Sequence, residues 1–378
     1  MVPEISVEEA ARRIAAGARL VDVREAAECL LGAPAGALRL PLSALQADPA
    51  GLPDDGRPLL LLCALGQRSR RAASLLLAAG RSEVASVAGG FAAWRAAGLP
   101  LDAEALWPDA PADAGERYDR HLRLAGVGLE GQRRLAGSSV LLLGAGGLGS
   151  PAALYLAAAG VGRLRIVDDD VVERSNLQRQ ILHAEADIGR PKVESARERL
   201  LALNPGVRVE AVRERLRAAN VEALLAGVDV VLDGSDNFAT RYLLNAACVR
   251  LGLPLVHAAI ERFHGQASVF VRAAPGGPKA PCYRCLHPEP PGPDAAPNCA
   301  EAGVLGVLPG LLGLLQATET LKLLLGLGEP LAGRLLLVDA LGLRFREVAL
   351  AADPDCTTCG PQARFTGYQE LEDACAAT

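Results

Sequence analysis

Two CxxC pairs in this 378-residue sequence could hold a metal ion. They are Cys282-Tyr-Arg-Cys285 and Cys356-Thr-Thr-Cys359. A CxxC turn lets two thiolates occupy two corners of a tetrahedron, so two pairs supply the four ligands of a structural Zn²⁺ site. Because the pairs lie far apart in the chain, the metal would join distant segments. Two redox-active CxxC pairs or incidental thiols are the alternatives.

Cys63 is placed for nucleophilic chemistry. It follows the apolar run LLLL and opens the loop CALGQR, which ends at Arg68 before a predicted helix. Backbone N–H groups, the helix N-terminus and Arg68 would stabilise a thiolate or a persulfide at this position. A buried structural cysteine at the end of a strand is the alternative.

A glycine-rich turn in the second half of the chain predicts a nucleotide site. The segment SSVLLLGAGGLGSPAALYLAAAGV places these glycines between a predicted strand and a predicted helix: Gly144, Gly146, Gly147 and Gly149. Ser150 is the expected N-cap and Pro151 the first helical residue. Glycines let the backbone approach a phosphate, which the helix N-terminus also favours. Asp168, at the end of the next predicted strand, argues against a turn chosen only for tight packing.

The polar residues that follow this second strand favour ATP over NAD. Asn176, Arg179 and Lys192 come after it, and the strand VDVVLDGSDN ends in Asp236 and Asn237. Both groups would meet at the carboxyl ends of adjacent strands, which is the usual ligand crevice of such sheets. Two cations and a carboxylate suit Mg²⁺-ATP, because the triphosphate needs its charge neutralised. An NAD-dependent oxidoreductase is the competing class.

Two α/β domains must position these residues. Residues 1–100 alternate apolar runs at 20–23, 59–62 and 84–87 with helical patterns, which predicts a small and mostly parallel sheet. Residues 101–116 are rich in Ala, Asp and Pro and predict a linker. Residues 117–378 predict a Rossmann-like, doubly wound sheet with an antiparallel C-terminal extension. Its strands are expected at 139–143, 164–168, 228–233 and 255–259.

Composition excludes several other classes of function. The formal net charge of -5 and the pI near 5.7 provide no broad basic field, so we expect no nucleic-acid partner. The acidic start MVPEISVEEA does not resemble an export signal, and we expect a cytoplasmic protein. The apolar region Val304–Leu327 is interrupted by Pro309, Glu319 and Lys322, which predicts a buried helix and no membrane span.

Residues 117–360 resemble the MoeB/ThiF family, whose motifs occur here in the family's order. They are RYDRHLRL, GAGGLGS, DDDVVERSNLQRQ, GRPKVES, DGSDN, CYRC, EAGVLG and CTTCG. The family, related to the ubiquitin-activating enzymes, consists of dimeric adenylyltransferases for ubiquitin-like sulfur-carrier proteins. The resemblance implies ATP-dependent adenylylation of the C-terminal glycine of a carrier ending in Gly-Gly, with release of pyrophosphate. The molybdopterin synthase small subunit is the favoured carrier. Thiamine-type or tRNA-thiolation carriers and a non-catalytic carrier-binding scaffold are the alternatives.

The resemblance also implies roles for individual residues. Asp168 would hold the ribose, and Asp236, next to Asn237, would hold Mg²⁺. The residues expected at the phosphates are Asn176, Arg179 and Lys192. Arg120 would reach the triphosphate in the neighbouring subunit, which implies a homodimer. Cys299 matches a cysteine that in some relatives bonds covalently with the carrier or accepts its sulfur, and a mobile-loop thiol is the alternative.

Residues 4–100 resemble rhodaneses. The resemblance lies in LVDVRE with Asp22 and Arg24, in the short loop from Cys63 to Arg68, and in the closing motif VAGGFAAW. It implies that Cys63 takes sulfur from a donor and passes it to the carrier adenylate, which leads to a thiocarboxylate. Phosphatases of related fold use a longer loop, so that role is disfavoured. In the better-known fusion the rhodanese-like domain follows the adenylation domain, whereas here it precedes it.

Overall fold

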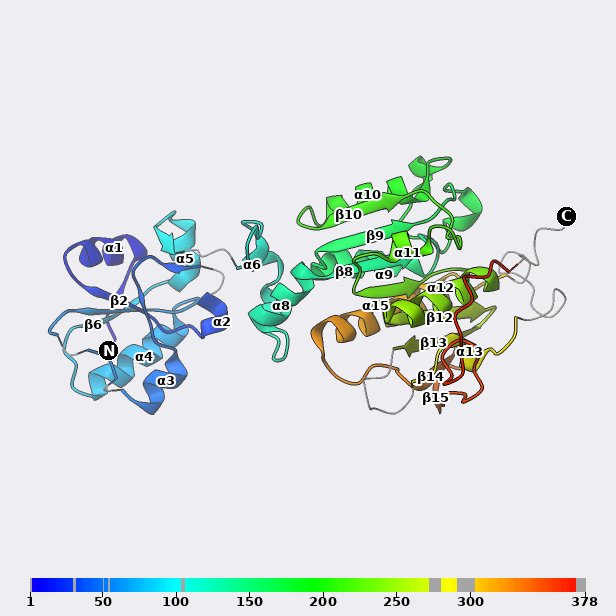
Figure 1. Ribbon diagram of the computed structural model, residues 1–378. Coiled ribbons are helices and arrows are strands. Elements are labelled where there is room, and N and C mark those ends of the chain that lie inside the picture. Colours follow the sequence, from blue (N-terminus) through cyan, green and yellow to red (C-terminus); the bar gives the residue numbers. More distant parts are fainter. Residues whose placement is uncertain are drawn as a thin grey trace. The chain divides into compact units, whose positions relative to one another are not determined.

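The computed structural model divides into two compact units, Met1–Gln132 and Arg133–Thr378 (Figure 1). It describes residues 2–29, 32–49, 51–53, 55–102, 106–271, 280–290 and 303–371. The strands of the first unit are β1 (Glu4–Ile5), β2 (Arg19–Asp22), β3 (Ala33–Pro34), β4 (Leu38–Arg39), β5 (Leu59–Leu62), β6 (Val84–Val87) and β7 (Leu101–Asp102). Its helices are α1 (Val7–Ala15), α2 (Ala26–Cys29), α3 (Leu42–Ala47), α4 (Gln67–Ala78), α5 (Gly90–Ala96), α6 (Ala114–Arg117) and α7 (Asp119–Leu122), while α8 (Gly128–Gly137) runs across the boundary.

A five-stranded parallel sheet forms the centre of the first unit, in the order β1-β6-β5-β2-β4. Alternate leucines of β5 pack on opposite faces, which is why the run LLLL is buried throughout. Leu59 and Leu61 pack in the core under α3 and α4, whereas Leu60 and Leu62 pack in the core under α1 and α5. Figure 1 shows these two helix pairs on opposite sides of the sheet. The predicted strands and helix of this region are therefore confirmed.

A small apolar cluster follows this sheet in the chain. It contains Leu106, Ala114, Tyr118 and Leu122. The rings of Trp107 and Tyr118 lie 5.9 Å apart. Part of the segment expected as a linker is therefore packed in the first compact unit.

The second unit is built on an eight-stranded sheet in the order β10-β9-β8-β11-β12-β13-β14-β15. Its strands are β8 (Ser139–Leu143), β9 (Arg163–Val167), β10 (Arg208–Val212), β11 (Val230–Asp233), β12 (Leu255–Glu261), β13 (His264–Phe270), β14 (Arg334–Asp339) and β15 (Arg344–Ala349). The five strands from β10 to β12 are parallel, and β13 to β15 continue the sheet in antiparallel fashion. This confirms the Rossmann-like sheet with an antiparallel C-terminal extension. Strand β10 was not expected, because RVEAV is short and mostly half-buried at the sheet edge.

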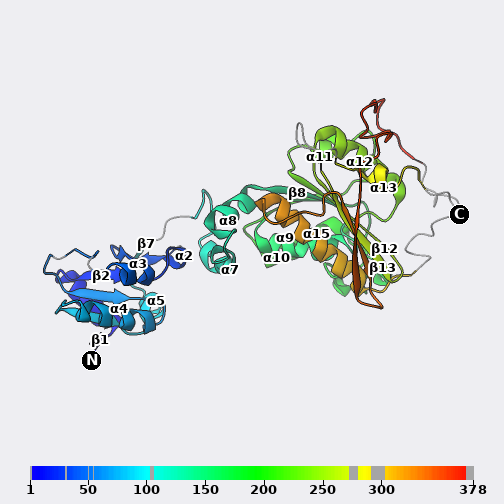
Figure 2. The same cartoon turned by 90° about the horizontal axis from the view of Figure 1, so that it is seen from below.

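Helices cover both faces of this sheet. They are α9 (Gly149–Ala159), α10 (Lys192–Leu203), α11 (Val221–Leu225), α12 (Phe238–Leu251), α13 (Tyr283–Leu286) and α15 (Val307–Leu325), with short 3₁₀ turns at Arg174–Asn176 and Glu185–Asp187. Figure 2 shows α9, α10 and α15 on one face and α11 and α12 on the other. The carboxyl ends of the five parallel strands lie along one edge of the sheet. The residues that follow these strands therefore gather at the same edge.

Helix α15 is, among the described residues, the one helix long and apolar enough to cross a membrane. It packs against α9 and against β11, β12 and β13. On its packed side, the Gln316 amide nitrogen donates to the carbonyl oxygens of Asp233 and Val256. The contacts match the expectation of a buried helix in this region.

The start of α9 corrects one sequence prediction. The helix begins at Gly149, and Leu148 is its N-cap residue. Ser150 therefore lies inside the first turn, where its hydroxyl donates to the carbonyl oxygen of Ala145 at 3.3 Å. Pro151, which was expected as the first helical residue, is the third residue of the helix.

Candidate functional site

The glycine-rich turn lines a cavity of about 350 Å³ at the carboxyl ends of β8, β9 and β11. Gly144, Gly146 and Gly147 face this cavity. Gly149 does not line it and serves packing, because a Cβ there would lie 2.0 Å from the carbonyl oxygen of Gly144. Gly146 has room for a Cβ, with Gln180 Nε2 as the nearest neighbour at 3.7 Å. The open space at Gly146 is therefore available to a ligand.

Asp168 presents a fixed carboxylate at the end of β9. One carboxylate oxygen accepts the N–H of Ala145 at 2.8 Å, and the other accepts the N–H of Asp170 at 2.9 Å. Burial raises the pKa of Asp168, while the nearby Lys192 and the two N–H donors act in the opposite direction. Each oxygen retains a lone pair for a further donor, which is the geometry that a ribose hydroxyl requires.

Both predicted cationic side chains line the same cavity. Lys192 is almost fully buried, and its Nζ lies 2.7 Å from a carboxylate oxygen of Asp170. Arg179 also lines the cavity and donates to Asn176 Oδ1 at 2.8 Å. Asn176 is not among the lining residues, so it orients Arg179 in this structure. The predicted cations are thus brought together within one cavity, with Asn176 behind one of them.

The loop after β11 forms another part of the cavity wall. Asp236 is exposed and lines the cavity together with Asn237. Asn237 is the N-cap of α12, and its side-chain oxygen accepts the N–H of Thr240 at 2.8 Å. Asp236 lines the same cavity as Arg179, Lys192 and the glycine turn. A carboxylate together with phosphate oxygens of the nucleotide is a usual ligand set for Mg²⁺. Magnesium fits this donor set.

Gln180, Arg215 and Arg241 are among the polar lining residues that were not predicted from the sequence. Arg241 lies one helical turn after Asn237, and this i, i+4 spacing on α12 could have indicated it. Its guanidinium donates to the carbonyl oxygen of Ser235 at 2.9 Å. Gln180 directly follows the predicted Arg179, whereas Arg215 has no such signal in the sequence.

Arg120 belongs to the first compact unit. Its side chain is 88% exposed, and its guanidinium lies 3.2 Å from the carboxylate of Asp119. The next residue, His121, forms a 2.9 Å hydrogen bond with Gln132. The role expected for Arg120 in a neighbouring subunit stays a prediction.

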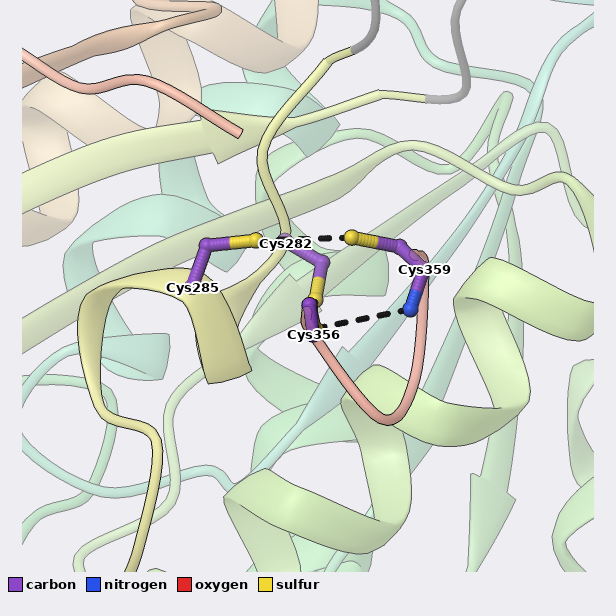
Figure 3. A group of neighbouring side chains, drawn as sticks. All are labelled: Cys282, Cys285, Cys356 and Cys359. Atoms are coloured by element: carbon purple, nitrogen blue, oxygen red, sulfur yellow. Dashed lines mark hydrogen bonds between the residues drawn. The ribbon is translucent and has the colours of Figure 1, made fainter. Parts of the chain in front are cut away.

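The four cysteines of the CxxC pairs converge in the second unit, as Figure 3 shows. Cys282 is the N-cap residue of α13 and Cys285 lies within that helix, while Cys356 and Cys359 come from the segment after β15. The sulfurs of Cys282 and Cys356 are 3.7 Å apart, and those of Cys285 and Cys359 are 3.4 Å apart. All four sulfur atoms lie within 4.8 Å of one another. Thiolates at about 2.3 Å from a tetrahedral Zn²⁺ would be separated by about 3.8 Å, so the cluster fits zinc.

Hydrogen bonds to these sulfurs also suit thiolates. The N–H of Asp353 donates to Cys285, and the side-chain amide of Asn245 donates to Cys282. Contact with the Cys359 thiol lowers the pKa of Cys282 to about 5, and the same contact raises the pKa of Cys359. Four crowded thiols cannot all ionise beside one another without a cation, whereas a bound metal deprotonates each ligand.

The Cys63 loop sits at the N-terminus of α4. Cys63 is buried, and its sulfur accepts the N–H of Gly66 at 3.1 Å and faces the Ser69 hydroxyl at 3.5 Å. Burial alone would raise the pKa of Cys63, but the Ser69 hydroxyl and the N–H groups of Ser69, Leu65 and Gly66 outweigh it, and the pKa is lowered. The loop therefore stabilises a thiolate, as a sulfur-transfer nucleophile requires.

Arg68 adopts a different arrangement from the one expected. Its guanidinium forms two 2.6 Å hydrogen bonds with the carboxylate of Glu28. The hydrogen bonds that lower the pKa of Cys63 come from Ser69 and the loop backbone. Glu28 was not predicted from the sequence, because a partner 40 residues away in the chain is visible in the fold alone.

The closing motif VAGGF has a direct role at this loop. The N–H of Phe91 donates to the carbonyl oxygen of Cys63 at 2.7 Å. A Cβ at Gly90 would lie 2.2 Å from that same oxygen, and Gly90 has a positive φ of 57°. The second glycine of the motif is therefore required by the close approach of α5 to the Cys63 loop.

Four cysteines lie outside the CxxC pairs and the Cys63 loop. Cys29 and Cys248 are buried, and burial raises the pKa of Cys29 to about 11 and that of Cys248 further. Buried thiols with raised pKa values are poor nucleophiles at neutral pH. Cys299 and Cys375 lie outside the described residues.

Comparison with known families identifies both units. The ThiF family model matches residues 118–358 and the rhodanese-like domain model matches residues 6–97. The chain belongs to the ThiF family and carries an N-terminal rhodanese-like domain. Both predicted domain identities, and the predicted order of the two domains, are confirmed.

Several named relatives agree with this. The SAMP-activating enzyme E1 of Haloferax volcanii is 56% identical over 68% of this chain and 92% of its own length. The sulfur carrier protein adenylyltransferase of Thermus thermophilus is 54% identical over 69% of this chain and 96% of its length. The probable adenylyltransferase/sulfurtransferase MoeZ of Mycobacterium tuberculosis is 51% identical, over 63% of this chain and 60% of its length. These relatives confirm the predicted enzyme class, an adenylyltransferase joined to a sulfurtransferase domain.

Solved structures support the fold. E. coli MccB, crystallised with AMPCPP and MccA, is 23% identical, with a TM-score of 0.56 over 65% of this chain and 74% of that chain. At this level of identity the likeness concerns the fold.

Proposed function

We propose that this enzyme uses ATP to adenylylate the C-terminal glycine of a ubiquitin-like sulfur carrier ending in Gly-Gly, and that its rhodanese-like domain supplies the sulfur for a thiocarboxylate. One observation carries the first half of the proposal. A single cavity brings together an open glycine turn, a ribose-type carboxylate, the cationic side chains of Arg179 and Lys192 and the exposed carboxylate of Asp236. An NAD-dependent oxidoreductase would not need this concentration of charge at the phosphates.

The residues divide the work of the first reaction. Asp168 binds the ribose, the glycine turn and the α9 N-terminus receive phosphate oxygens, and Arg179 and Lys192 neutralise the triphosphate. Mg²⁺ held by Asp236 would supply further charge neutralisation. A carboxylate oxygen of the carrier attacks the α-phosphorus, the bond to pyrophosphate breaks, and an acyl-adenylate is formed. Because no covalent enzyme intermediate is needed, the rate enhancement comes from alignment and charge stabilisation.

Sulfur transfer begins at Cys63. The thiolate attacks a sulfur donor and retains one sulfur as a persulfide. The terminal sulfur then attacks the acyl-adenylate, AMP leaves, and an acyl disulfide joins carrier and enzyme. A second thiol that attacks the Cys63 sulfur releases the thiocarboxylate and leaves a disulfide. Cys299 is our candidate for this second thiol.

The four-cysteine cluster would hold Zn²⁺ in a structural role, since four thiolates leave no open coordination position. We further propose that the enzyme is a cytoplasmic homodimer in which Arg120 completes the neighbouring subunit's nucleotide site. The molybdopterin synthase small subunit is the carrier that we favour, and carriers of thiamine synthesis or tRNA thiolation are the alternatives.

Two variants test the adenylation site. Asp236→Ala should abolish ATP-pyrophosphate exchange in a protein that remains folded, because the metal ligand is lost. Near-normal exchange would remove the metal role assigned to Asp236. Mixing Arg120→Ala with Asp236→Ala chains should restore part of the activity, because mixed dimers contain one intact site. Absence of any recovery in demonstrably mixed dimers would contradict the shared site.

The sulfur route is tested separately. Cys63→Ala should lose thiocarboxylate formation from a supplied sulfur donor while retaining ATP-pyrophosphate exchange. Unchanged thiocarboxylate formation would count against the transfer from Cys63.

A further inference from the structure

A buried histidine-carboxylate pair lies beneath the loop that carries Asp236. His257 in β12 is fully buried, and its Nδ1 lies 2.8 Å from Oδ2 of Asp233, which is 1% exposed. Asp233 ends β11, three residues before Asp236. Since a carboxylate oxygen can only accept, the hydrogen of this bond is carried by Nδ1. Neither residue was among the predicted site residues.

The carboxylate of Asp233 connects this histidine to the loop. Its other oxygen, Oδ1, accepts both the N–H of Ser235 at 3.0 Å and the Ser235 hydroxyl at 2.6 Å. The carbonyl oxygen of Ser235 in turn accepts the guanidinium of Arg241 at 2.9 Å. Ser235, Asp236 and Arg241 all line the nucleotide cavity. The position of the loop is therefore set by hydrogen bonds that converge on a carboxylate oriented by His257.

The far side of the histidine ring is packed by aromatic groups. The ring of Tyr283 lies 5.0 Å from it in an edge arrangement, and that of Phe270 lies 6.0 Å away. Nε2 is buried and has no hydrogen-bond partner among the residues that the structure describes. A buried polar atom without a partner costs free energy, so packing of the ring cannot be the sole reason for a histidine here. The hydrogen bond from Nδ1 to Asp233 offsets this cost.

We propose that His257 is a positioning residue for the nucleotide site: through Asp233 it fixes the loop that presents Asp236 to the metal-nucleotide complex. This inference rests on the proposed function, because it takes Asp236 as the ligand of the divalent cation. Partners that orient a metal ligand typically contribute roughly 10- to 100-fold to metal affinity or activity. The effect of losing the Nδ1 donor should therefore appear in metal binding, while the glycine turn and Asp168 keep their own contacts.

The test uses two substitutions of the same histidine in the full-length chain. In His257→Asn the amide nitrogen can occupy the place of Nδ1 and keep the donor. His257→Leu removes the donor while keeping a side chain of similar volume. If the leucine variant does not fold, His257→Gln is used in its place, because the glutamine amide reaches the position of Nε2 and not that of Nδ1. Exposed His264 on β13 provides a matched control as His264→Leu.

Binding of Mn²⁺ to the protein in the presence of AMPCPP is measured by loss of the free Mn²⁺ signal in electron paramagnetic resonance. Binding of AMPCPP without added divalent metal is measured by calorimetry. We expect His257→Leu to weaken Mn²⁺ binding by roughly tenfold, with His257→Asn and His264→Leu close to the parent chain. Metal-free AMPCPP binding should stay within about twofold in all of them, a split that general loss of structure would not produce.

Equal Mn²⁺ binding by the parent and His257→Leu would overturn the inference, as would an equal loss in the leucine and asparagine variants, which would assign the effect to the ring volume. Asp236→Ala, measured in parallel, separates this outcome from failure of the proposed function. If Asp236→Ala binds Mn²⁺ normally, the metal role of Asp236 fails and the inference fails with it. If Asp236→Ala loses Mn²⁺ and His257→Leu does not, the inference alone fails.

Discussion

Alanine substitutions at two glycines of the same turn should affect different properties, one the stability of the fold and the other nucleotide binding. At Gly149 a Cβ would lie 2.0 Å from the carbonyl oxygen of Gly144, which is backbone and cannot swing aside. At Gly146 the nearest atom is Gln180 Nε2, at 3.7 Å, an ordinary van der Waals contact. Gly149→Ala should therefore damage the fold of the second unit, whereas Gly146→Ala should damage nucleotide binding.

The magnitudes follow from these contacts. Overpacking costs about 1–3 kcal/mol, and the better helix propensity of alanine offsets up to about 1 kcal/mol, so Gly149→Ala should lower the free energy of unfolding by about 2 kcal/mol. Gly146→Ala should change that free energy by less than about 0.5 kcal/mol. Its methyl group would instead occupy the cavity space proposed for a phosphate. We expect the dissociation constant for ATP to rise about tenfold, which corresponds to a loss of about 1.4 kcal/mol in binding free energy.

Urea unfolding followed by circular dichroism tests the first part. Both tryptophans, Trp94 and Trp107, belong to the first unit, so tryptophan fluorescence would not follow unfolding at Gly149 directly. Calorimetric titration with AMPCPP tests the second part. Parent-like AMPCPP affinity in Gly146→Ala would refute the argument that the nucleotide phosphates lie against this turn. A Gly149→Ala protein as stable as the parent would refute the packing role of Gly149.

Three further predictions concern the cysteine sites. Ser69→Ala should raise the pKa of Cys63, because the hydroxyl next to the sulfur favours the thiolate; the pH profile of Cys63 alkylation should move to higher pH, and an unmoved profile would contradict this. Glu28→Gln should free Arg68 to attract anionic donors and raise kcat/KM for thiosulfate by roughly tenfold. Glu25→Gln, which removes the same charge without releasing Arg68, is the control, and equal effects in both variants would argue against the pairing. Cys282→Ser should lower the zinc content, measured by mass spectrometry, and should also lower the thermal stability of the second unit. Cys63→Ser is the control and should retain both. Full zinc content in Cys282→Ser would contradict the four-thiolate site.

The sequence predicted features that depend on local pattern. Buried runs such as Leu59–Leu62 mark parallel strands because both faces of the sheet are covered. The CxxC spacing indicated the sulfur cluster, because two ligands from one turn need no knowledge of the tertiary fold. Residues after strand ends, such as Lys192 and Asp236, were expected in one crevice and do line one cavity.

Features that depend on contacts between distant segments were missed. The pairing of Arg68 with Glu28 and the pairing of His257 with Asp233 both join elements that the pattern alone cannot place side by side. Gly149 looked equivalent to its neighbours in the turn, yet its role is decided by a single backbone oxygen. Sequence spacing thus located the sites, whereas the division of labour within each site required the fold.

Adenylylation of a carrier protein is the reaction proposed for this enzyme. ATP-pyrophosphate exchange with Mg²⁺, using purified carriers that end in Gly-Gly from molybdopterin, thiamine and tRNA-thiolation pathways, tests it most directly. We predict exchange that depends on a carrier and is greatest with the molybdopterin type. No exchange with any carrier, in protein shown to be folded, dimeric and zinc-loaded, would contradict the proposed adenylyltransferase activity.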